Sequence, residues 1–118
     1  MITAVTSALL AIGVSMNAAA VDITEPHYED MGVYRISVYC ERCNEEVGYQ
    51  SASGTRLDYG QVAMNEVPFG TVINIDGEEF VVTDRVGVAN TVDIFIPSDD
   101  GRCHCNWLEY RHVYRKEE

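Results

Sequence analysis

Positive charge is scarce in this chain. Its 118 residues include 8 Lys and Arg against 19 Asp and Glu, which gives a formal net charge of −11 at pH 7. A protein that binds nucleic acid needs clustered Lys and Arg against the phosphates, so this composition argues against nucleic acid as a partner. It also gives no electrostatic attraction to anionic membranes or acidic wall polymers. A glycan partner would have to be held by shape, hydrogen bonds and aromatic faces.

Charge is absent altogether from residues 1–20. Their apolar run at 8–14, followed by small residues up to Ala20, is typical of a secretory signal peptide that is cleaved after Ala20. No Lys or Arg lies near the start, so an uncleaved apolar anchor helix is the alternative. In either case we expect an exported protein, with no membrane interaction beyond this segment.

Helical periodicity of convincing length is missing from the rest of the chain. Residues 21–30 are polar and are expected to form a linker, and residues 31–118 are expected to form one domain. Short apolar or alternating runs predict strands at 31–39, 61–64, 71–75, 79–83, 92–96 and 107–114. The Asp76-Gly77 pair between two of these runs predicts a tight hairpin. Many short strands separated by turns favour an all-β fold, a small six-stranded barrel.

Cysteine is present in two closely spaced pairs. The four residues are Cys40, Cys43, Cys103 and Cys105. An even number in a short exported chain favours disulfides for all four, and the second pair is too close in sequence to bond comfortably with itself. We therefore expect a link between the two pairs and no metal. A zinc site of four thiolates, to which His104 and His112 could contribute, and free thiols remain the alternatives.

Two acids lie at the ends of apolar runs. Asp84 follows the run 80–83, Asp93 precedes the run 94–96, and a turn of small residues at 87–90 separates them. A carboxylate at the rim of a strand is partly removed from water, which raises its pKa and suits it to proton transfer. The alternative is that both acids are solvated turn residues.

Five short motifs, in order along the chain, resemble the three-aspartate (3D) domain family. They are Ser51-Ala52-Ser53-Gly54-Thr55, Val62-Ala63-Met64-Asn65, Val67-Pro68-Phe69-Gly70-Thr71-Val72, Thr83-Asp84-Arg85 and Val92-Asp93-Ile94-Phe95. The opening Tyr39-Cys40 with Cys43 is similar to that of short secreted members. The resemblance covers about residues 38–96. It implies a double-psi β-barrel related to the C-terminal part of membrane-bound lytic transglycosylase A.

The resemblance also implies an activity on peptidoglycan. In the related lytic transglycosylases a single aspartate cleaves the bond between N-acetylmuramic acid and N-acetylglucosamine, and Asp93 occupies the corresponding motif. Asp84 would supply a nearby negative charge, and Asn65 and Thr83 would orient the two acids. No cofactor is implied, and we expect a monomer.

Two positions depart from the family pattern. Asn65 stands where the first of the three aspartates is usual, and it keeps the hydrogen bonding of an aspartate without its charge. Arg85 replaces the Thr of a Thr-Gly-Gly sequence, and a cation there would lower the pKa of the acids. An Asn65→Asp variant, which restores the third acid, is expected to preserve or raise activity. Tyr59 and Trp107 are candidate faces for stacking on sugar rings, and Thr83 is a further candidate for binding the substrate.

Three functions remain compatible with these features. The chain can be a lytic transglycosylase or glycosidase, an inactive barrel that binds wall glycan or a protein partner, or a module stabilised by zinc on the four cysteines.

Overall fold

The computed structural model describes residues 26–43, 48–99, 101–103, 105 and 108–117. The expected signal or anchor segment, residues 1–20, lies outside this part of the chain, as do His104 and Trp107. Within the described part the secondary structure is entirely β, and it contains no helix that is long and apolar enough to span a membrane.

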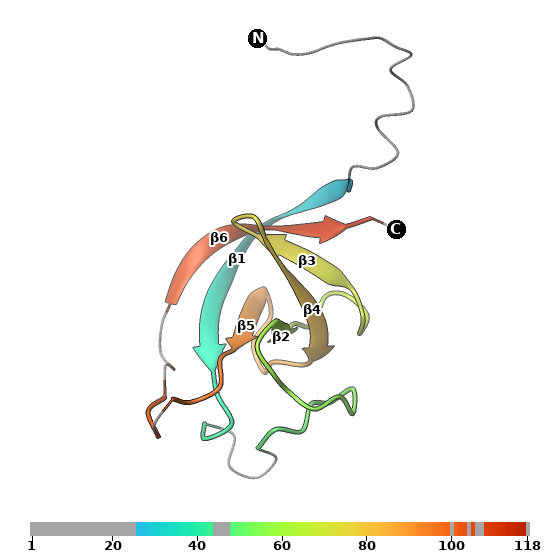
Figure 1. Ribbon diagram of the computed structural model, residues 1–118. Coiled ribbons are helices and arrows are strands. Elements are labelled where there is room, and N and C mark those ends of the chain that lie inside the picture. Colours follow the sequence, from blue (N-terminus) through green and yellow to red (C-terminus); the bar gives the residue numbers. More distant parts are fainter. Residues whose placement is uncertain (1–25, 44–47, 100, 104, 106–107, 118) are drawn as a thin grey trace, which may run out of the picture.

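Six strands close into a barrel, which confirms the predicted all-β, six-stranded fold (Figure 1). They are β1 (Tyr28–Tyr39), β2 (Gln61–Ala63), β3 (Val72–Ile75), β4 (Glu78–Asp84), β5 (Thr91–Phe95) and β6 (Leu108–Lys116). Their order around the barrel is β1-β5-β2-β4-β3-β6. β1 begins at Tyr28, within the stretch 21–30 that the sequence assigns to a linker.

The barrel mixes parallel and antiparallel pairs. β1 runs parallel to β5 and β2 runs parallel to β4, whereas the other four neighbouring pairs are antiparallel. Because β1 and β5 are parallel, both end at the same edge of the barrel. Figure 1 shows the loops that follow these strands gathered at that edge. This is where the candidate site lies.

Two apolar clusters lie on opposite faces of the strands. The larger one fills the barrel, with Ile36 from β1, Val82 from β4 and Val92 from β5 among its buried members. The smaller one contains Tyr39, Leu57, Ala63 and Phe95. Side chains alternate between the two faces of a strand, so residues next to a barrel-core position point towards the outer cluster. The polar residues of the site belong to this outer face.

The hairpin between β3 and β4 has the predicted two-residue turn. Ile75 pairs with Glu78, and Asp76 and Gly77 between them have φ angles of 53° and 89°. Positive φ at both central positions is what the tightest hairpin turns require, and Asp-Gly is among the sequences that adopt it most readily.

Candidate functional site

Asp93 lies in an open groove beside β1. Ser37 is its register partner on β1, and the Ser37 hydroxyl donates a hydrogen bond of 2.9 Å to Asp93 Oδ1. Its neighbours Val92 and Ile94 belong to the barrel core, so alternation directs Asp93 outward. The groove has a volume of about 450 Å³ and is lined by Arg35, Ser37, Val38, Tyr39, Cys43, Asp93, Cys105 and Leu108.

The surroundings of Asp93 favour its protonated form. Burial raises the pKa of this carboxyl above its ordinary value, and the negative charge of Asp84 adds to the rise. The hydrogen bond from Ser37 acts in the opposite direction without cancelling the effect. Asp93 is thus a half-buried acid whose proton is retained to higher pH than that of a solvated aspartate.

A β-bulge in β4 brings Asp84 to the same face. Val62 of β2 pairs with Val82 of β4, but the next residue, Ala63, pairs with Asp84, which leaves Thr83 as the extra residue. A bulge of one residue reverses the alternation that follows it and so redirects a side chain. Ala63 is also the register partner of Asp93 on β5. The two acids therefore flank one residue of β2.

The Asp84 carboxylate is occupied by three donors. Oδ1 accepts the backbone N–H of Ala52 at 2.8 Å and that of Arg85 at 2.9 Å, and Oδ2 accepts the Tyr39 hydroxyl at 3.1 Å. Asp84 is buried and does not line the groove. It holds the loop 51–55 against the end of β4, and its contribution to Asp93 is electrostatic.

Tyr39 bonds to Asp84 and lies close enough to Asp93 to feel its charge. Its ring packs edge-on against Phe95 with 5.3 Å between the ring centroids, and it lines the groove of Asp93. Burial raises the pKa of Tyr39, and the charge of Asp84, the hydrogen bond to Asp84 and the charge of Asp93 raise it further. Tyr39 therefore stays protonated and acts as a hydrogen-bond donor.

Asn65 is engaged elsewhere. Its Nδ2 donates to the Val86 carbonyl at 2.6 Å, and its Oδ1 accepts the Val86 N–H at 3.0 Å. This pair of bonds clamps the segment after β2 to the segment after β4. Asn65 does not line the groove of Asp93, so the structure gives it a local role in holding these two segments together.

Arg85 is directed away from the acids. Its Nη1 donates to the carbonyls of Met64 and Val67, at 2.7 Å and 3.1 Å, and its guanidinium lies 3.9 Å from the centroid of the Phe69 ring. Within the described residues no ion pair joins Arg85 to either acid. The cation that the sequence places next to Asp84 therefore serves to hold the 64–69 segment.

The expected substrate-binding residues are not gathered around Asp93. Thr83 donates to Gln61 Oε1 at 2.7 Å and lines a different hollow, of about 480 Å³. Tyr59 donates to Glu78 Oε2 at 2.7 Å and packs edge-on against Phe80. Neither residue lines the groove of Asp93. Trp107 lies outside the described part of the chain.

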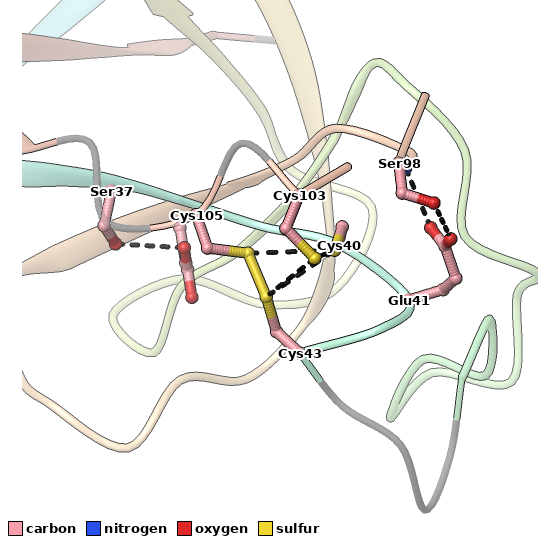
Figure 2. Close-up of a disulfide and its surroundings, with 8 residues drawn as sticks. Ser37, Cys40, Glu41, Cys43, Ser98, Cys103 and Cys105 are labelled. Carbon is pink, nitrogen blue, oxygen red and sulfur yellow. Dashed lines mark hydrogen bonds between the residues drawn. A yellow bond between two sulfur atoms is a disulfide. The ribbon is translucent and has the colours of Figure 1, made fainter. Parts of the chain in front are cut away.

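Two of the four cysteines, Cys43 and Cys105, line the groove of Asp93. Cys43 and Cys105 are joined by a disulfide, which links the two pairs as the sequence predicted (Figure 2). Cys40, which is buried, and Cys103, which is exposed, are free thiols. The Cys43–Cys105 bond meets the expectation of at least one disulfide between the two pairs.

A larger hollow lies away from these groups. It has a volume of about 560 Å³ and is lined by Glu29, Gly70, Thr71, Val72, Arg115, Lys116 and Glu117. This hollow is lined by both acidic and basic residues. None of the candidate catalytic or substrate-binding residues lines it. Volume alone therefore does not identify the site, and the raised pKa of Asp93 favours the smaller groove.

Sequence reasoning missed Ser37 and the bond from Tyr39 to Asp84. The alternation of β1 carries the signal: Ile36 and Val38 face the barrel core, so Ser37 and Tyr39 share the opposite face. What the sequence of β1 does not contain is the identity of the strand that lies beside it.

Comparison of the chain with known proteins returned no match among family models, curated proteins or solved structures.

Proposed function

We propose that this chain is a peptidoglycan-active domain of the 3D type, and that it cleaves glycan strands as a lytic transglycosylase with Asp93 as the acid. The observation that carries the proposal is the half-buried Asp93 carboxyl, which has a raised pKa and opens onto a groove. A general acid must hold its proton near the working pH and must reach the substrate, and Asp93 meets both requirements.

The barrel topology supports the double-psi form of the fold. Two parallel pairs, β1 with β5 and β2 with β4, are embedded in a closed six-stranded barrel, and β2 and β5 join them as antiparallel neighbours. This arrangement fits the fold that the resemblance of residues 38–96 implies.

The proposed reaction needs a single carboxyl group. Protonated Asp93 donates its proton to the oxygen between N-acetylmuramic acid and N-acetylglucosamine, and the bond from muramic C1 to that oxygen breaks. The muramic C6 hydroxyl then bonds to C1 and returns its proton to Asp93. The products are a 1,6-anhydromuramic end and a free N-acetylglucosamine hydroxyl. No water is consumed, and the acid ends the cycle protonated as it began.

The neighbouring residues have supporting roles in this proposal. Ser37 fixes the orientation of the Asp93 carboxyl through its bond to Oδ1. Burial keeps the pKa of Asp93 raised, and the charge of Asp84 adds a smaller contribution. Arg35 is the one Lys or Arg among the described residues that line the groove, and it can pair with a carboxylate of the muramic acid or its peptide. No cofactor takes part, and the domain would act as an exported monomer.

Incubation of the full chain with purified peptidoglycan, followed by mass spectrometry, tests the proposal. We expect anhydro-muropeptides from the wild type and none above background from Asp93→Asn, because the variant keeps the shape of the side chain but cannot carry the proton. Asp58→Asn removes the same charge from an exposed loop position and is the matched control.

The same experiment separates catalysis from binding. If wild type and Asp93→Asn both sediment with peptidoglycan but release no anhydro-muropeptides, the chain is a binding barrel and Asp93 is not its acid. If the wild type neither cleaves nor sediments, the function on peptidoglycan is refuted.

A further inference from the structure

We propose that the four cysteines form a structural zinc site when the chain is reduced. Their sulfur atoms all lie within 4.8 Å of one another. Cys40 and Cys43 lie in the turn that follows β1, and Cys103 and Cys105 lie in the segment before β6. The inference does not depend on the action of Asp93 and goes beyond it.

The distances between sulfurs are those of a tetrahedral centre. A zinc ion with Zn–S bonds of about 2.3 Å separates its four sulfurs by roughly 3.8 Å. Cys40 lies 3.5 Å from Cys43 and 3.7 Å from Cys105, and Cys43 lies 4.0 Å from Cys103. Three separations thus fit a zinc site before any side chain moves.

Two of the three remaining separations are too short for zinc ligands and would have to lengthen. Cys40 and Cys103 are 2.8 Å apart, which is too long for a bond and too short for zinc ligands. A second disulfide would shorten this contact, whereas zinc would lengthen it. Zinc also requires the Cys43–Cys105 bond to open. The Cα atoms of that pair are 7.4 Å apart, farther than in most disulfides, and a bridging ion accommodates the longer span.

The backbone already presents the ligands. Cys40-x-x-Cys43 has the spacing of structural zinc motifs, and its turn is closed by a 3.1 Å bond from the Cys43 N–H to the Cys40 carbonyl. The Glu41 side chain accepts the Ser98 N–H at 3.0 Å, which ties this turn to the segment that leads to Cys103 (Figure 2).

The turn before Cys103 is also fixed. Asp99 and Arg102 exchange two backbone hydrogen bonds, of 3.0 Å and 2.8 Å, so Cys103 follows a closed turn. Ligands that are held before the ion arrives lose less conformational freedom on binding, which favours a tight site.

The conversion balances with a dithiol as the reductant. The dithiol gives two electrons and two protons to the Cys43–Cys105 bond, which becomes two thiols, while the dithiol becomes a disulfide. Zn²⁺ then replaces the four thiol protons and binds four thiolates. Four sulfur ligands leave no open position, so the ion would be structural rather than catalytic. It would replace the disulfide as the link between β1 and the segment before β6, on the wall of the Asp93 groove.

Zinc uptake by the full chain tests the site. The protein is reduced with a phosphine, supplied with Zn²⁺, freed of excess metal and measured for zinc per chain. We expect one zinc per reduced wild-type chain and none in the oxidised chain. Cobalt in place of zinc should give the intense thiolate-to-metal charge-transfer absorption of a four-sulfur site.

Cys40→Ser and Cys103→Ser supply the variants, because each removes a ligand while the Cys43–Cys105 disulfide can still form. Loss of a residue that only orients a zinc ligand weakens metal affinity by roughly 10- to 100-fold. Each serine variant loses a ligand itself, so in the reduced state its zinc affinity should fall by more than that. A reduced wild type without stoichiometric zinc overturns the proposal. So does equal zinc retention by the serine variants or by the oxidised chain, since other ligands would then hold the metal.

Discussion

Asp84 and Asp93 lie opposite the same residue, Ala63, from the two sides of β2. The acids are brought together because β4 and β5 are the two neighbours of β2, and the bulge at Thr83 turns Asp84 to the required face. One acid is then buried under three hydrogen bonds, while the other opens onto the groove. This asymmetry assigns one acid to structure and electrostatics and leaves the other available for chemistry.

Asp84→Asn should lower the pKa of Asp93. The negative charge of Asp84 disfavours ionisation of Asp93, so neutralising that charge makes ionisation easier. Burial is the larger cause of the raised pKa and remains, so the value should fall while staying above that of a solvated aspartate. NMR titration of the Asp93 carboxyl carbon measures this. A pKa that is unchanged or higher in the variant would show that the two charges are not coupled.

Tyr39→Phe should destabilise the barrel by about 1.5–3 kcal/mol, as expected for loss of a hydrogen bond to a charged group. The variant keeps the ring that packs on Phe95 and removes only the hydroxyl that donates to buried Asp84. Urea denaturation gives the change in unfolding free energy. Tyr59→Phe is the control, because its hydroxyl bonds to an exposed carboxylate and water can replace it. Equal losses in the two variants would contradict the buried role of Tyr39.

Asp93→Asn should gain stability relative to wild type as the pH rises. Below the ordinary value of 3.8 the Asp93 carboxyl is protonated in both folded and unfolded chains, so its ionisation has no effect. Above 3.8 the unfolded chain ionises first, and the wild-type unfolding free energy falls until the pH has passed the raised folded pKa. Asparagine does not ionise, so the difference should grow over this window and then level off.

Unfolding curves of both proteins from about pH 3 to pH 8 measure that difference. Ser37→Ala provides the complementary test, because the Ser37 hydrogen bond lowers the pKa of Asp93. Without this hydrogen bond the pKa of Asp93 should rise further, so the fall in unfolding free energy should extend to higher pH. A difference between Asp93→Asn and wild type that is constant with pH would refute the raised pKa.

The strands could be predicted because their signals are local. Alternation along β1, the short apolar runs of the other strands and the Asp76-Gly77 turn each lie within a few residues of sequence. The ends differ by up to three residues. At β1, for example, pairing with β6 extends the strand back to Tyr28, and that pairing depends on a segment far along the chain.

The site could be predicted only in part, because its geometry depends on closure of the barrel. Apolar patterning placed both acids at strand ends, which is correct for Asp84 and wrong for Asp93, the central residue of β5. Which strands become neighbours is decided by long-range pairing. The bulge at Thr83 arises from the fit between β2 and β4 and has no signature in Thr83 itself. The same holds for Arg85, whose carbonyl partners lie 18 and 21 residues earlier in the sequence.

Asn65→Asp should destabilise the fold by about 0.5–1.5 kcal/mol, the net contribution of a typical hydrogen bond, because this position is exposed. The Asn65 amide donates to the Val86 carbonyl, and a carboxylate cannot donate. The bond from the Val86 N–H would remain. We therefore expect Asn65→Asp to be less stable than wild type, while its activity is preserved or raised because the third acid is restored. Thermal unfolding and the anhydro-muropeptide assay, made on the same samples, separate the two effects.

Asn65→Ala is the control for this variant, because it removes both bonds and adds no charge. It should be at least as destabilising as Asn65→Asp if the clamp is what matters. If Asn65→Asp is as stable as wild type, the clamp is dispensable and the position is free for a third acid.

Loss of the Cys43–Cys105 disulfide should lower the unfolding free energy of the oxidised chain by about 4 kcal/mol, from the loop-closure entropy of a 62-residue separation. The bond closes a loop that contains β2, β3, β4 and β5, so its absence gives the unfolded chain much more freedom. The double variant Cys43→Ser/Cys105→Ser, compared with wild type by urea denaturation without metal or reductant, measures this.

The control is Cys40→Ser/Cys103→Ser, which also replaces two cysteines but leaves the Cys43–Cys105 bond intact. It should retain most of the wild-type stability, and a loss as large as that of the first variant would mean that the four sulfurs are interchangeable in cross-linking the chain.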